Sequence, residues 1–132
     1  MAVIYRPTDR LKYEIGELTF TIAPLDYVQK NEIVEAIKAA QAARSVKEIH
    51  DASLLALKYA LKGVNGATYA DGEPFDLKFD GSLVADESVH ELLNIDVAPK
   101  LLALIGAFIS NVPSELPDGV KFVPAKKKQD QQ

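Results

Sequence analysis

The sequence predicts a single α+β domain that is predominantly helical, with about four helices, an N-terminal β-hairpin and one further short strand. Apolar side chains alternate with polar ones around a Gly-Glu pair near the N-terminus, which is typical of a hairpin. Several later segments carry apolar residues at helical spacing behind capping residues. The length of 132 residues is that of one domain.

The hairpin and the first helix follow one another closely. We expect two antiparallel strands within residues 11–23, with Gly16 at the first position of a tight turn. Asp26 followed three residues later by Gln29 is a capping-box pattern. The sequence therefore predicts a helix over residues 27–44.

A second capping-box pattern opens the next helix. Ser45 precedes Glu48 by three residues, and apolar residues follow at helical spacing over residues 46–62. Gly63 stands where a glycine often ends a helix. The apolar surface of this helix is wider than one stripe, which indicates contacts on more than one side.

The second half of the domain is predicted as a strand and two helices. Phe75, Leu77 and Phe79 alternate with charged residues, which predicts a strand over residues 75–79. We expect Asp86 to cap a short helix that ends at Leu93.

The last predicted helix, over residues 97–111, begins after Asp96, which we expect to cap it. It is apolar nearly all round, and we favour an intermolecular surface over a purely central core helix. We therefore expect the chain to divide into an α+β assembly-chaperone domain over residues 1–112 and a Pro-containing, disordered tail over residues 113–132.

Composition excludes several classes of function. The net charge of −4 argues against a general nucleic-acid binder, which needs a basic surface for phosphates. The absence of cysteine excludes disulfides, thiolate catalysis and cysteine-based zinc sites. No apolar run approaches the roughly 20 residues of a membrane helix, and we expect no membrane partner.

No catalytic, cofactor or metal residue emerges from the pattern. His50 and His90 have no ligand-type residue at the spacing of a metal-binding helix. Residues 76–87 match part of a calcium loop, but Lys78 occupies the third position, where an oxygen ligand is needed. We therefore expect no catalytic group, no cofactor and no metal.

The order of elements resembles a known family. The segments "LKYEIGELTFTIAPLDYVQKNEI", "LLALKYALKGVNG" and "ADGEPFDLKFDGSLVADESVHELLNI", followed by an apolar helix and a lysine-bearing end, resemble the tail assembly chaperones of long, non-contractile-tailed bacteriophages. The similarity covers about residues 11–112. It implies a non-enzymatic protein of the host cytoplasm that binds the tape measure protein, keeps it soluble and helps to recruit tail tube subunits, without entering the mature virion.

The resemblance also implies self-association and a longer form made by a programmed frameshift near the lysine codons of residues 126–128. The alternative is a structural tail-tube or head-tail connector subunit of a phage particle. We expect a helical client to bind apolar side chains of the second and fourth helices. These candidate partner-binding residues are Leu54, Leu57, Leu61, Leu101, Leu104, Ile105 and Phe108.

Overall fold

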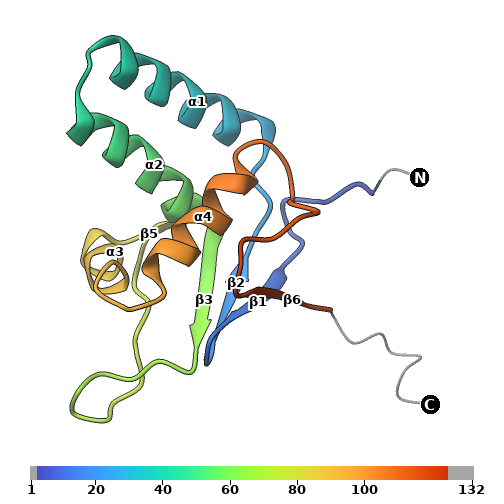
Figure 1. The fold of residues 1–132 in the computed structure, drawn as a ribbon, viewed down its shortest axis with the longest axis vertical. Helices are drawn as coiled ribbons and strands as arrows, with labels where there is room; N and C mark the ends of the chain where they lie inside the picture. The colour runs from blue at the N-terminus through green and yellow to red at the C-terminus, as the bar shows by residue number, and fades with distance from the viewer. Residues whose placement is uncertain (1–2, 125–132) are drawn as a thin grey trace.

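The computed structural model describes residues 3–124, in which four helices and a small antiparallel sheet form an α+β domain (Figure 1). The helices are α1 (Tyr27–Ala42), α2 (Val46–Ala60), α3 (Asp86–Leu92) and α4 (Ala98–Phe108). The strands are β1 (Leu11–Ile15), β2 (Leu18–Ile22), β3 (Leu61–Asn65), β4 (Phe79–Asp80), β5 (Leu83–Val84) and β6 (Val120–Val123).

The N-terminal hairpin is confirmed. Strands β1 and β2 pair antiparallel, with Ile15 opposite Leu18, so the connection is the two residues Gly16 and Glu17. Gly16 has a φ of 62°, which suits the first central position of a type II′ turn.

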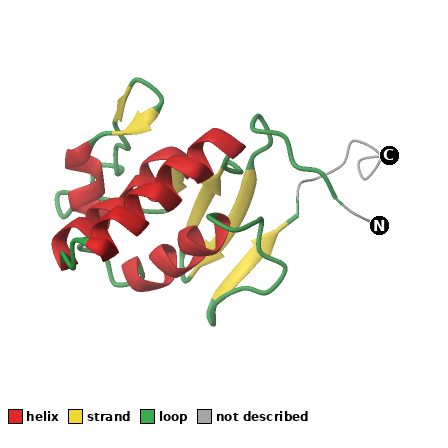
Figure 2. Cartoon of the chain, turned by 90° about the horizontal axis from the view of Figure 1, so that it is seen from above, coloured by secondary structure: helices red, strands yellow, loops and turns green. Residues whose placement is uncertain are grey.

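The main sheet has the strand order β3-β2-β1-β6, and its two faces differ in polarity. Tyr13 and Ile15 of β1 are buried, whereas Lys12 and Glu14, which alternate with them, are exposed. Figure 2 shows the helices gathered to one side of the strands. The core therefore lies between the helices and the apolar face of the sheet, and the other face is open.

The predicted disordered tail over residues 113–132 is wrong for its first part. Strand β6 pairs antiparallel with β1, and its Val120 is 7% exposed. The ring of Phe122 lies 5.4 Å from the ring of Tyr13, centroid to centroid. Burial of Val120, the contact of Phe122 with Tyr13 and the ladder with β1 order the segment, so the domain extends beyond the predicted boundary at residue 112. Residues 125–132, which include the three lysines, lie outside the described part of the chain.

Helices α1 and α2 form an antiparallel hairpin. The predicted capping box of α1 is present, since the Asp26 carboxylate accepts from the Gln29 amide and the Gln29 side chain accepts from the Asp26 amide. At α2, the Ser45 hydroxyl accepts from the Glu48 amide at 3.2 Å, which is half of the predicted box.

Helix α2 ends earlier than predicted and passes directly into a strand. Gly63 does not cap the helix; it lies in β3 opposite Thr21. The backbone amide of Ala23, before α1, donates to the carbonyl of Ala60 at the end of α2, at 2.8 Å. The two ends of the helical hairpin are therefore joined at the sheet.

The strand predicted over residues 75–79 is mostly absent. Only Phe79 and Asp80 form a strand, β4, which pairs with β5. The amide of Phe75 donates to the Ala67 carbonyl, and that of Lys78 donates to the Ser88 hydroxyl. No neighbouring strand takes up these groups, so residues 75–78 form a loop despite their alternating pattern.

Helices α3 and α4 are present without the predicted aspartate caps. Their N-cap residues are Ala85 and Val97, and neither has a side-chain cap. Asp86 is instead the first residue of α3, where a carboxylate still interacts favourably with the helix dipole. Asp96 precedes the N-cap of α4.

Candidate functional site

The predicted partner-binding residues lie mainly inside the core. Six of them are at most 1% exposed: Leu57, Leu61, Leu101, Leu104, Ile105 and Phe108. Helix α4 thus packs its main apolar side chains against α2 and the sheet rather than presenting them outward. Leu54 of α2 differs from the other six, because it is only half-buried and reaches the surface.

Leu54 lies in a groove between α2 and α3, with a volume of about 380 Å³. The lining residues are Asp51, Leu54, Lys58, Asp86, Val89 and His90. Those from α2 lie at i, i+3 and i+7, and those from α3 at i, i+3 and i+4, so each set shares one helix face. The groove therefore combines an apolar strip with charged residues on both helices.

An ion pair spans this groove. The Lys58 ammonium lies 2.5 Å from the Asp86 carboxylate. The hydrogen bond from Lys58, together with its positive charge, lowers the pKa of the Asp86 carboxyl. The side chain of Lys58 is 28% exposed, whereas that of Asp86 is 78% exposed, so water and salt screen much of this contact. The pair bridges α2 and α3, and Leu54 lies beside it in the groove.

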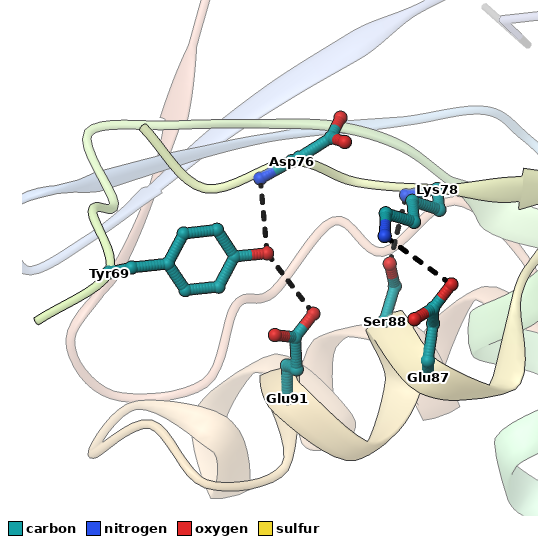
Figure 3. A network of polar contacts seen from close by, with 6 residues as sticks. All are labelled: Tyr69, Asp76, Lys78, Glu87, Ser88 and Glu91. Carbon is teal, nitrogen blue, oxygen red and sulfur yellow. Dashed lines mark hydrogen bonds and ion pairs between the residues drawn. The ribbon is translucent and has the colours of Figure 1, made fainter. Parts of the chain in front are cut away.

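A second feature of this region is the acidic arm, residues 66–80, which follows β3 and ends with the short strand β4. Figure 3 shows how polar contacts hold the arm on α3. The Tyr69 hydroxyl donates to the Glu91 carboxylate at 3.2 Å, and the Lys78 amide donates to the Ser88 hydroxyl at 2.9 Å. The Lys78 ammonium lies 3.6 Å from the Glu87 carboxylate.

A cavity of about 230 Å³ lies between the arm and α3. Its apolar wall includes Phe75, Leu92 and Ile95. The rings of Phe75 and Tyr69 lie 5.7 Å apart, centroid to centroid, and together line one side. This cavity can accept an apolar side chain.

The structure places the residues considered for metal or proton chemistry on different elements. His50 is exposed on α2, and His90 lies at the rim of the groove on α3. In the calcium-like segment, Lys78 at the third position is paired with Glu87 at the twelfth. Among residues 3–124, no group of three or more histidine or acidic side chains is placed to hold a metal ion.

The sequence interpretation missed Asp51, Lys58, Asp86, Val89 and His90 as groove residues. The spacing of the three α3 residues was a usable signal, because it places them on one helix face. The packing of that face beside Leu54 depends on how α3 returns to α2, and no local pattern encodes it.

In the part of the chain that the structure describes, no helix has both the length and the apolar character needed to span a bilayer. Comparison with family models, curated proteins and solved structures finds no match.

Proposed function

We propose that this chain is a non-enzymatic tail assembly chaperone of a long, non-contractile-tailed bacteriophage. It binds the tape measure protein in the host cytoplasm, keeps it soluble and helps to recruit tail tube subunits, and it does not enter the mature virion. The observation that carries the proposal is the sequence resemblance over about residues 11–112, in which the hairpin, the second helix and the "ADGEPFDLKFDG" block occur in the family's order.

The groove between α2 and α3 is the surface on which we place the client. A helical segment that lays one apolar stripe into a groove needs an apolar floor and a polar rim. Leu54 and Val89 supply the floor, while Lys58, Asp86 and His90 supply charge on the rim. The buried residues of α4 support this surface from beneath.

Co-expression with the tape measure protein tests the proposal. Leu54→Asp puts a charge into the groove floor, and we expect the soluble fraction of the client to fall toward its level without the chaperone. Val46→Asp is the matched control, because Val46 begins the same helix and is 82% exposed. Client solubility that is unchanged by the wild-type chain would contradict the chaperone function itself.

Purified virions provide a second test. A chaperone that leaves before maturation is absent from the particle, so mass spectrometry should not find the chain there. Stoichiometric presence would instead favour the alternative of a tail-tube or head-tail connector subunit.

A further inference from the structure

The cavity between the acidic arm and α3 has a firm apolar wall. Its volume is about 230 Å³, and Phe75, Leu92 and Ile95 are among the residues that line it. Leu92 is 2% exposed, and both Phe75 and Ile95 pack against the hydrophobic core. Pockets for drug-sized ligands measure roughly 300–1,000 Å³, so the size of this cavity suits a single side chain.

Glu91 places a carboxylate on the wall of this cavity. One of its oxygens accepts a hydrogen bond from the Tyr69 hydroxyl at 3.2 Å (Figure 3). Among residues 3–124, Glu91 forms no salt bridge and its side chain has no other hydrogen bond. The neutral hydroxyl holds the carboxylate in place without balancing its charge, and the second oxygen is left for a donor that enters the cavity.

Two aromatic rings lie on the same cavity wall. The rings of Tyr69 and Phe75 are 5.7 Å apart, centroid to centroid, with 54° between their planes. The face of an aromatic ring attracts a cation within about 6 Å. A guanidinium is planar, so it stacks on such a ring while its N–H groups donate to a carboxylate. The combination of rings and Glu91 therefore favours an arginine over a purely apolar side chain.

The arm surrounds the cavity with further negative charge. Its exposed carboxylates are Asp71, Glu73, Asp76 and Asp80, and within residues 3–124 none of them forms a salt bridge. The one cation in the sequence of the arm, Lys78, is paired with Glu87 of α3. This charge attracts a basic partner at long range and repels an acidic one.

The cavity is formed before any partner binds. The Tyr69 amide donates to the Glu73 carbonyl at 2.7 Å, and the Phe75 amide donates to the Ala67 carbonyl at 2.9 Å. Both aromatic residues are therefore fixed through their own backbone. Because this wall is already ordered, an incoming side chain binds without the entropic cost of arranging the arm.

We propose that this cavity binds an arginine side chain of a partner protein. The aliphatic part of the arginine packs on Leu92 and Ile95, while its guanidinium stacks on Phe75 and donates to the carboxylate of Glu91. The cavity shares no lining residue with the α2–α3 groove. The proposal therefore does not depend on the client or on its binding in that groove.

An NMR titration of the full chain with a five-residue peptide, one arginine between glycines, tests the site. We expect saturable shifts of the amide signals of the arm and of α3. Peptides with leucine or lysine in place of the arginine should bind more weakly, because leucine carries no charge and the lysine ammonium is compact and strongly hydrated. Both peptides are blocked at their ends, so only the central side chain differs.

Glu91→Gln separates charge from shape, because the amide oxygen still accepts from Tyr69 while the negative charge is removed. It should raise the dissociation constant of the arginine peptide by about tenfold, whereas Glu35→Gln on the exposed surface of α1 should leave it unchanged. Phe75→Leu keeps an apolar wall without the ring, should also weaken binding, and serves if Glu91→Gln loses its folded spectrum. An arginine peptide that causes no saturable shifts in the arm and α3, a leucine or lysine peptide that binds as tightly, or a folded Glu91→Gln chain with unchanged affinity would overturn the proposal.

Discussion

The hydroxyl of Ser88 on α3 accepts a hydrogen bond from the backbone amide of Lys78 at 2.9 Å, and Ser88 itself is fully buried. This contact joins the end of the acidic arm to α3. A backbone amide outside a strand ladder needs a partner of this kind, since an unpaired buried donor is costly. The Ser88 hydroxyl thus supplies the acceptor that a neighbouring strand would have provided for the amide of Lys78.

Ser88→Ala should destabilise the fold by about 1–3 kcal/mol, because the amide of Lys78 loses its acceptor in a shielded place. Denaturant unfolding measures the change, and hydrogen exchange at Lys78 should quicken. Ser53→Ala is the control, since the Ser53 hydroxyl bonds only the carbonyl of Ile49 in its own exposed helix turn. Equal effects of the two substitutions would contradict this role of Ser88.

The Lys58–Asp86 pair predicts a pH-dependent stability. The hydrogen bond from Lys58 lowers the pKa of Asp86 in the folded state, so the pair stabilises the fold above the ordinary aspartate pKa of about 3.9. That stability is lost as the pH falls through the lowered folded-state pKa. Asp86→Asn should therefore be less stable than the wild type near neutral pH, and the difference should shrink in acid.

Unfolding curves of the same substitution in a Lys58→Met background provide the control for the ion pair. Without the lysine, the pH dependence of the difference between aspartate and asparagine should shrink, and only the smaller contributions of the α3 dipole and His90 should remain. A dependence that persists unchanged would show that another group is responsible.

Two glycine substitutions should have opposite effects. Gly66 has a φ of 96°, and an added Cβ would lie 2.7 Å from the Glu17 carbonyl oxygen, so Gly66→Ala should destabilise by about 1–3 kcal/mol. Gly106 lies within α4, and an added Cβ there meets nothing within 4 Å. Gly106→Ala should stabilise by about 0.5–1 kcal/mol. Melting temperatures that move in the same direction for both would contradict the backbone geometry.

Val120→Ala tests whether β6 belongs to the domain. The side chain is 7% exposed, and its truncation should cost about 1–3 kcal/mol in the free energy of unfolding. Val46→Ala, at a position 82% exposed, should change stability by less than about 0.5 kcal/mol. A disordered segment would give no effect at Val120.

The elements that the sequence predicted well are those with local causes. The β1–β2 hairpin follows from Gly16 and short-range alternation, and α1 follows from Asp26, Gln29 and helical spacing. These signals involve residues within a few positions of each other, so they need no knowledge of the rest of the fold.

The elements that were missed depend on distant partners. Strand β6 exists because Val120 meets Ile15 in the ladder, more than a hundred positions earlier in the chain. Residues 75–78 alternate like a strand, but no strand lies beside them. A helix that is apolar on all sides, such as α4, can be buried in the core of its own domain or in an interface with another molecule. In this chain α2 and the sheet pack against α4, which places it in the core.

Only part of the candidate site could be predicted from the sequence. Leu54 was proposed from the width of the apolar surface on α2, and it does reach the α2–α3 groove. Its neighbours Leu57 and Leu61 were proposed on equal grounds, yet both are fully buried. Helical periodicity indicates which face of a helix a side chain lies on, but it does not indicate which other element packs against that face.

The hydrogen bond from Ala23 to Ala60 has a mechanical consequence. It clamps the base of the α1–α2 hairpin, and α2 continues without a linker into β3. The α1–α2 hairpin is therefore attached to the sheet without a flexible linker between α2 and β3. A partner that binds the far tip of this hairpin, near Ser45, would therefore contact an element whose base is attached directly to the sheet.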